Sequence, residues 1–132
     1  MTPKELVVKF FEEGYTYGNY DFVMEYVADD YIDNSPANAR SNADTVGILK
    51  IVANQFSDFR ARVLDVFGEG DKVSVRVEFT GVHTGECMGI APTGRRISFE
   101  ALEIFKVKEG KIVESWGYWP DKEIEEKLRA DI

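Results

Sequence analysis

The sequence predicts a single α+β domain over residues 1–132, with helices packed on one face of a curved antiparallel sheet. Three observations lead to this prediction. Apolar residues recur at helical spacing up to about Phe56 and then alternate with polar residues, as in half-buried strands. Helical spacing returns only after Pro120. The chain has no internal repeat and no flexible linker, and its 132 residues suit one compact domain.

The first part of the chain carries three helical patterns and one extended piece. Thr2 and Glu5 form a capping box, which predicts a helix from the start of the chain. A second, shorter helix is expected from Asn19, followed by an extended piece within residues 28–36. Ser41 is a typical N-cap residue and predicts the start of the third helix.

The second part of the chain reads as an antiparallel meander that ends in one helix. Residues 84–96 are rich in glycine and are expected to form a loop. Pro120 should end the last strand, and Asp121 should cap a final helix that buries Ile124 and Leu128. The strands are expected at residues 60–67, 73–79, 97–107 and 112–119.

Charge and composition exclude several classes of function. The formal net charge of -8 argues against nucleic acid and anionic membranes as partners, because both are polyanions. One cysteine, Cys87, and one histidine, His83, leave no internal disulfide and argue against a metal site. The N-terminal residues resemble neither a signal peptide nor a membrane anchor, so a soluble, cytoplasmic protein is expected.

Glu103 interrupts an apolar row in the predicted strand 97–107. A carboxylate on a core-facing row is costly unless it is paired or lines a cavity, where burial would raise its pKa and suit it to proton transfer. A bulge that flips the register would instead place Glu103 in water. If Glu103 faces inward, its expected cross-strand neighbours are Val77, Val113 and Ser115. The residues on its face of the strand are Ile97, Phe99, Ala101, Phe105 and Val107.

Two further polar positions are candidates for the same cavity. His83 continues the inward-facing row of its strand, but it should lie about 20 Å from Glu103, which favours a structural or loop-mouth role. Asp33 and Asn34 end the short extended segment before Pro36. Their side chains could point into a pocket mouth, although Asp and Asn commonly cap turns.

The opposite face of the predicted sheet is also apolar. Leu102 and Ile104 on one strand lie beside Trp116 and either Tyr118 or Trp119 on the next. Exposed apolar residues on this scale predict a homodimer through the sheet. The alternative is that the terminal helix covers this face.

Three segments resemble the SnoaL-like polyketide cyclase family, in the superfamily of nuclear transport factor 2 and ketosteroid isomerase. They are residues 81–86, 89–96 and 109–116. The resemblance implies a cone-shaped α+β barrel around one deep apolar pocket, frequent dimers and no cofactor. Cyclases of this family close a polyketide ring by an intramolecular aldol reaction that uses only acid–base side chains.

The resemblance also assigns roles to individual positions. Glu103 stands where the cyclases have a pocket histidine and where ketosteroid isomerases have the acid that donates to the oxyanion. Gly117 stands where the cyclases have their catalytic aspartate, and Ser115 where relatives have a histidine. Asn34 lies near the position of the isomerase base. Neither catalytic pair is therefore complete.

These observations predict an enzyme without a cofactor that acts on a small polyketide-like or steroid-like carbonyl compound. The alternatives are a non-catalytic protein that binds a small hydrophobic ligand and a dimeric interaction module. The candidate catalytic residues are Glu103 and Asp33. The candidate ligand-binding residues are Tyr15, Tyr31, Asn34, His83, Met88, Phe99, Ser115 and Trp119.

Overall fold

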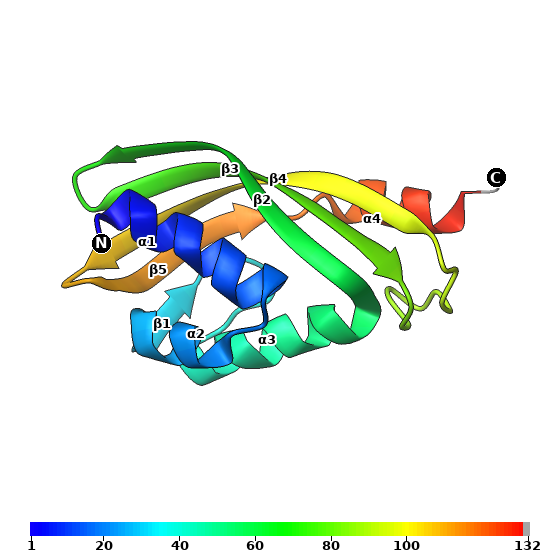
Figure 1. Cartoon of the computed structure of the whole chain (residues 1–132), viewed down its shortest axis with the longest axis horizontal. Helices are drawn as coiled ribbons and strands as arrows, with labels where there is room; N and C mark the ends of the chain where they lie inside the picture. The colour runs from blue at the N-terminus through cyan, green and yellow to red at the C-terminus, as the bar shows by residue number, and fades with distance from the viewer. Residues whose placement is uncertain (131–132) are drawn as a thin grey trace.

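The computed structural model describes residues 1–130, which form helices packed on the concave face of a curved sheet (Figure 1). The predicted α+β class is confirmed. The helices are α1 (Pro3–Phe10), α2 (Tyr20–Tyr26), α3 (Asn42–Gln55) and α4 (Asp121–Arg129), and a π-helical segment, η1 (Phe11–Thr16), follows α1. The strands are β1 (Val27–Asp33), β2 (Phe56–Glu69), β3 (Lys72–His83), β4 (Arg96–Lys108) and β5 (Lys111–Tyr118).

The sheet has the strand order β1-β5-β4-β3-β2. The last four strands of the chain form the expected antiparallel meander. The expectation of a wholly antiparallel sheet is wrong for one pair, because β1 runs parallel to β5 and places Asp33 beside Ser115. No hairpin joins β1 to β5, so turn geometry does not impose an antiparallel direction on this pair.

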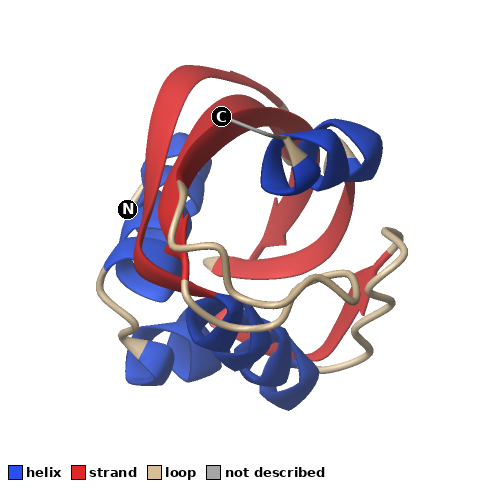
Figure 2. Ribbon diagram, turned by 90° about the vertical axis from the view of Figure 1, so that its right-hand side faces the viewer, coloured by secondary structure: helices blue, strands red, loops and turns tan. Residues whose placement is uncertain are grey.

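The sheet curls around an interior that is visible when the molecule is viewed end-on (Figure 2). Strand β2 contributes to this curvature through register shifts between Ser57 and Arg60 and between Val63 and Asp65. Asp58 lies inside the first shift, at a positive φ of 50°. This irregularity breaks the alternation of apolar residues, which is why the sequence pattern indicated β2 only from Arg60 although it begins at Phe56.

A layer of aromatic rings joins the N-terminal helices to the sheet. Phe11 packs edge-on against Phe105 of β4, with ring centroids 5.5 Å apart. Phe79 of β3 contacts Tyr15 at 5.1 Å and Trp119 at 4.7 Å. Such contacts add to the hydrophobic stabilisation from burying the rings. They also hold η1 against the concave face, where it forms one wall of the interior.

The sequence predicted the N-terminal cap of the first helix correctly and that of the last helix wrongly. The capping box at Thr2 and Glu5 is present, with the Glu5 N–H donating to Thr2 Oγ1 at 3.1 Å. The expectation that Asp121 caps α4 is wrong, because Pro120 takes the N-cap position and no side chain caps the helix. Asp121 is instead the first helical residue, where its charge still favours the positive end of the helix dipole.

Within residues 1–130, no helix combines the length and the apolar character needed to cross a lipid bilayer. The longest helix, α3, runs over 14 residues and exposes several polar side chains along its outer side.

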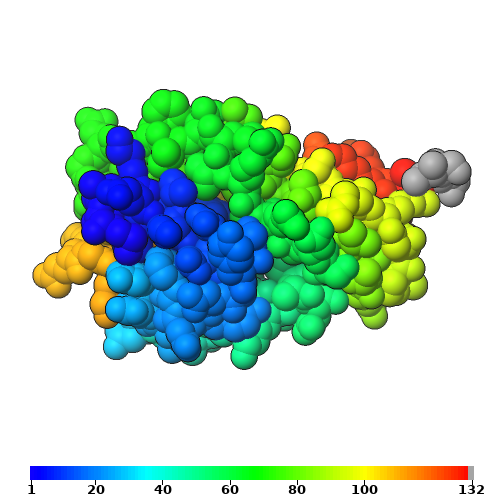
Figure 3. Space-filling model, viewed as in Figure 1, coloured from blue at the N-terminus to red at the C-terminus, as the bar shows by residue number. Residues whose placement is uncertain are grey.

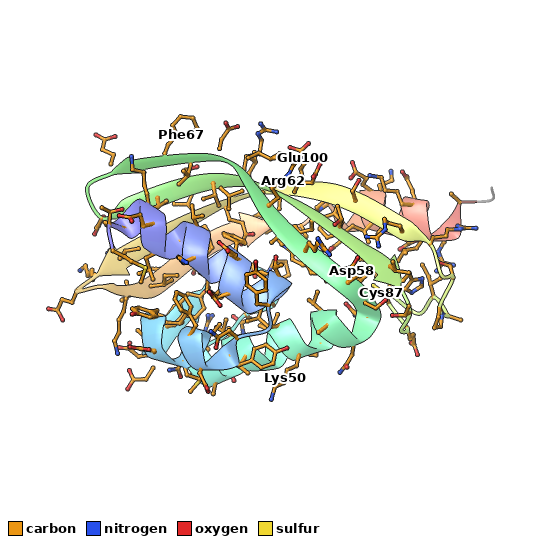
Figure 4. All side chains as sticks on the ribbon, viewed as in Figure 1. Lys50, Asp58, Arg62, Phe67, Cys87 and Glu100 are labelled. Atoms are coloured by element: carbon orange, nitrogen blue, oxygen red, sulfur yellow. The ribbon has the colours of Figure 1, made fainter. Side chains whose placement is uncertain are left out.

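The convex face of the sheet carries an uncovered apolar patch beside charged residues. The patch residues Leu102, Ile104 and Tyr118 are 68%, 42% and 69% exposed, so α4 does not cover them. Next to the patch, Arg76 pairs with Glu100 at 2.6 Å. Figure 4 shows Glu100 on this outer side of the sheet, away from the helices. Exposed ion pairs of this kind contribute little stability.

We propose that two copies of the chain pair through this patch. Light scattering at micromolar concentration should then give the mass of a dimer, and Leu102→Glu should give a monomer, because it places a charge in the apolar contact. Ile51→Glu is the matched control, since Ile51 is 57% exposed but lies on α3, away from the convex face. A wild-type monomer, or a dimer that Leu102→Glu leaves intact, would contradict the proposal.

Candidate functional site

A cavity of about 300 Å³ lies between the concave face of the sheet and the helices. Its walls are mainly apolar and come from the helical elements α1, η1, α3 and α4 and from the strands β1, β2, β4 and β5. On the face shown in Figure 3, the N-terminal helices pack closely beside β2 and α3. Large apolar side chains of the lining include Phe10, Leu49, Phe56, Phe99, Phe105, Trp119 and Ile124.

The cavity opens between three segments of the chain. Most of its lining is shielded from solvent, and the exposed lining residues are Pro36, Ala37, Met88 and Asp121. They come from the connection between β1 and α3, from the loop at residues 84–95 and from the start of α4. Cys87, labelled in Figure 4, lies in the same loop and also lines the cavity. A ligand would therefore enter beside α4.

Glu103 lies on the concave face of β4 and lines the cavity. The residues directly opposite it are Val75 on β3 and Gly117 on β5, so the expected neighbours Val77, Val113 and Ser115 are not its direct partners. The difference on β5 arises because this strand has one extra residue opposite the step from Lys106 to Val107 of β4. The extra residue shifts the register of the β4–β5 pairing.

One oxygen of the Glu103 carboxyl group makes no hydrogen bond to a described residue. Its Oε2 is out of contact with solvent and has no partner among the described residues. Burial, and to a lesser extent the negative charge of Asp33, raise the pKa of Glu103 to about 7, although a hydrogen bond with the Trp119 side chain partly offsets them. The Glu103 carboxyl group can therefore gain or lose a proton near neutral pH.

Asp33 is the second carboxyl group of the cavity, and its surroundings differ from those of Glu103. Asp33 is 8% exposed and accepts hydrogen bonds from the Ser35 N–H at 2.8 Å and from Ser35 Oγ at 2.7 Å. Ser115 Oγ donates to it at 3.5 Å and also bonds to the Tyr31 hydroxyl. The parallel pairing of β1 with β5 creates this network by placing Asp33 beside Ser115.

Two tyrosines of the cavity remain protonated and serve as donors. Burial raises the pKa of Tyr15 well above its usual value, and the charge of Glu103 raises it further. Burial also raises the pKa of Tyr31, although its bond to Ser115 partly offsets this effect. Tyr31 is committed to Ser115, whereas the Tyr15 hydroxyl makes no hydrogen bond to another described residue. Tyr15 is therefore available to a ligand.

Most of the predicted site residues lie together in this cavity. The lining includes both candidate catalytic residues, Glu103 and Asp33. It also includes six of the candidate ligand-binding residues, namely Tyr15, Tyr31, Met88, Phe99, Ser115 and Trp119.

Asn34 and His83, which were predicted to bind ligand, do not line the cavity. Asn34 follows Asp33 and therefore points to the other side of β1, where its side chain donates to Glu114 at 3.0 Å. His83 is fully buried at the far end of β3, and its Nδ1 accepts a hydrogen bond from the Thr93 N–H at 3.2 Å. It therefore anchors the loop at residues 84–95.

The sequence reasoning missed several residues of the lining. Asp121 was expected to cap α4 but lies at the opening of the cavity. Ser35 was not singled out in the sequence, yet its N–H and hydroxyl both donate to Asp33. Cys87 is buried, and burial together with the charge of Asp121 raises the pKa of its thiol, which makes it a weak nucleophile. The Asp33-Asn34-Ser35-Pro36 turn signal could have indicated the role of Ser35.

Related proteins were found by sequence. The chain is 26% identical over 125 residues to the aklanonic acid methyl ester cyclase AcmA of Streptomyces galilaeus, a match that covers 92% of this chain and 86% of that protein. It is also 26% identical over 110 residues to the nogalonic acid methyl ester cyclase of Streptomyces nogalater, with coverage of 79% and 80%.

Solved structures of related proteins have the same fold as this chain. IdmH of Streptomyces antibioticus, a proposed polyketide cyclase, superposes with a TM-score of 0.88 at 26% identity, covering 98% of this chain and 100% of that one. AclR of Streptomyces galilaeus, a proposed hydroxylase, superposes with a TM-score of 0.83 at 27% identity, covering 96% and 94%.

The curved sheet around helices places this protein in the fold class of nuclear transport factor 2 and its relatives. The sequence model of the SnoaL-like polyketide cyclases matches residues 5–128, which is nearly the whole chain. The chain therefore belongs to the SnoaL-like polyketide cyclase family. This finding confirms the resemblance noted in the sequence.

The raised pKa of Glu103 predicts a pH-dependent loss of stability. Between about pH 4.5 and about pH 7, the folded protein binds more protons than the unfolded chain, so the free energy of unfolding should fall as the pH rises. Glu103→Gln lacks this effect. Its stability relative to wild type should therefore increase across that window, by at most about 3 kcal/mol, and then level off.

Chemical denaturation at several pH values measures this difference. Glu126→Gln is a suitable control, because Glu126 is exposed on α4 and the substitution should leave the pH dependence of wild type unchanged. A constant difference between Glu103→Gln and wild type from about pH 5 to about pH 8 would show that Glu103 is not buried as a neutral acid.

Proposed function

We propose that the protein is a cofactor-independent enzyme of the cyclase or isomerase type, which acts on a small polyketide-like carbonyl compound by acid–base chemistry. One observation carries this proposal: the cavity holds two carboxyl groups in contrasting surroundings. Glu103 has a buried oxygen without a partner and a raised pKa, whereas Asp33 accepts several hydrogen bonds. Environments that separate two carboxyl groups in this way are typical of acid–base pairs.

In the proposed reaction, the Asp33 carboxylate removes a proton from a carbon next to a carbonyl group. The resulting carbanion attacks a second carbonyl carbon of the same molecule, and a carbon–carbon bond forms. The electron pair of that carbonyl moves to its oxygen, which takes the proton of Glu103. Proton return from Asp33 to Glu103 through solvent completes the cycle, so substrate and product are isomers. The Tyr15 hydroxyl, which burial keeps protonated, is a second donor for the developing oxyanion.

The cavity favours an uncharged ligand. Its lining includes the carboxyl groups of Asp33, Glu103 and Asp121 and contains no Lys, Arg or His. A ligand carboxylate would meet negative charge without a compensating cation. The similar cyclases AcmA and that of Streptomyces nogalater are named for methyl esters, in which the acid is neutralised. The aromatic walls and the volume of about 300 Å³ suit a compact, mostly apolar ring system.

Aklanonic acid methyl ester is therefore the first substrate to test. Ring closure leaves the mass unchanged, so the product is detected by chromatography and NMR. Glu103→Gln should bind this ester but turn it over about 100-fold more slowly, because the amide lacks the acidic proton. Asp33→Asn should also abolish the exchange of the substrate's acidic C–H for deuterium in D2O, which mass spectrometry detects.

Glu126→Gln is again the control and should retain wild-type turnover. If the wild-type protein bound the ester without ring closure or deuterium exchange, the enzyme proposal would fail for this substrate class. The alternative of a ligand-binding protein predicts that result, together with only a modest change in affinity for Glu103→Gln. Full turnover by Glu103→Gln would assign the acid to another residue.

A further inference from the structure

Gly117 occupies an interior position of β5, which lies between β1 and β4 in the sheet. Glycine in the middle of a strand is destabilising, because it loses more conformational freedom than other residues and packs no side chain. The backbone does not require it, since Gly117 is not among the positive-φ glycines of residues 1–130. The absence of a side chain must therefore have another reason.

The space beside Gly117 is filled by Glu103. A Cβ atom added at Gly117 would lie 2.5 Å from Glu103 Cγ and 3.2 Å from both its Cβ and Cδ atoms. The two residues are directly opposite each other on β4 and β5. The contacts involve the stem of the Glu103 side chain, so a methyl group at position 117 would force the whole side chain into another rotamer.

The other close glycines of the described chain serve different purposes. A Cβ at Gly81 would meet the rings of Phe59 and Phe56, which belong to the core. A Cβ at Gly85 would meet the backbone oxygen of Asn54 at 1.9 Å, so that glycine permits a close approach of two chain segments. Gly117 differs because the atoms in its space belong to an ionisable side chain of the cavity.

We propose that Gly117 is a positioning residue for Glu103. Because Gly117 has no side chain, the Glu103 side chain has room to lie across β5 within the cavity. The consequence for turnover rests on the proposed function, whereas the position of the carboxyl group does not. Any side chain at position 117 displaces Glu103, and the acid then no longer faces a bound carbonyl oxygen.

The direct test follows Glu103 by NMR in protein labelled with ¹³C at the glutamate carboxyl carbons. Wild type should show one carboxyl that titrates at about pH 7 and that is missing in Glu103→Gln. In Gly117→Ala this titration should move toward the ordinary value of about 4.5, because the displaced carboxyl reaches water. Gly68→Ala is the matched control, since Gly68 is also in a strand but its added Cβ would meet the flexible Lys4 side chain at 3.1 Å and the Lys72 backbone oxygen at an ordinary 3.7 Å.

A double variant keeps the test decisive if Gly117→Ala folds poorly. When Glu103→Ala removes Cγ and Cδ and leaves only the Cβ contact at 3.2 Å, adding Gly117→Ala should lower the melting temperature far less than Gly117→Ala does in wild type. If the double variant were as destabilised as Gly117→Ala alone, position 117 would need glycine for a reason unrelated to Glu103, and the proposal would be overturned. An unchanged titration at about pH 7 in well-folded Gly117→Ala would also overturn it.

The turnover of aklanonic acid methyl ester separates this proposal from the function proposed above. Gly117→Ala should lose activity about as strongly as Glu103→Gln, by roughly 100-fold. If wild type had no turnover while the titration still moved in Gly117→Ala, the proposed function would fail and the positioning role would stand. If Gly117→Ala kept full turnover while Glu103→Gln lost it, the positioning role would fail alone.

Discussion

The burial of one carboxyl group, that of Glu103, is the constraint on which the site depends. One oxygen of this buried carboxyl group has no hydrogen-bond partner among the described residues, which makes its ionised form costly and raises its pKa to about 7. The aromatic layer between η1 and the sheet is extensive and offsets this cost, and one of its members, Trp119, also forms a hydrogen bond with the carboxyl group. In the proposed mechanism, Glu103 on β4 is the proton donor and the hydrogen-bonded Asp33 on β1 is the proton acceptor.

Three local departures from regular sheet geometry bring these groups together. The parallel pairing of β1 places Asp33 next to Ser115. The register shift near Val107 places Gly117, not Trp116, opposite Glu103. The missing side chain of Gly117 leaves the space in which Glu103 lies. Each departure costs some regularity in the sheet, and together they produce a cavity with two unlike carboxyl groups.

The sequence predicted the fold class and the inward direction of Glu103 because both depend on local periodicity. Strand β4 pairs with β3 without a shift from Arg96 to Lys106, so alternation along the strand holds. The pairing of β1 with β5 joins segments about 80 residues apart, and nothing in either segment specifies it. Asn34 was misplaced because alternation on β1 sends it to the opposite side from Asp33. Asp121 was misplaced because Pro120 occupies the cap position that a polar residue usually takes.

The central claim is that Glu103 is the proton donor of the cavity and Asp33 its carboxylate. Neutron diffraction from deuterated crystals at about pH 6, one unit below the pKa of about 7, tests this claim most directly. The account predicts a deuterium atom on the Glu103 carboxyl group, which faces the cavity, and none on Asp33. An ionised Glu103, or a deuterium atom on Asp33 with Glu103 turned toward the convex side of the sheet, would contradict it.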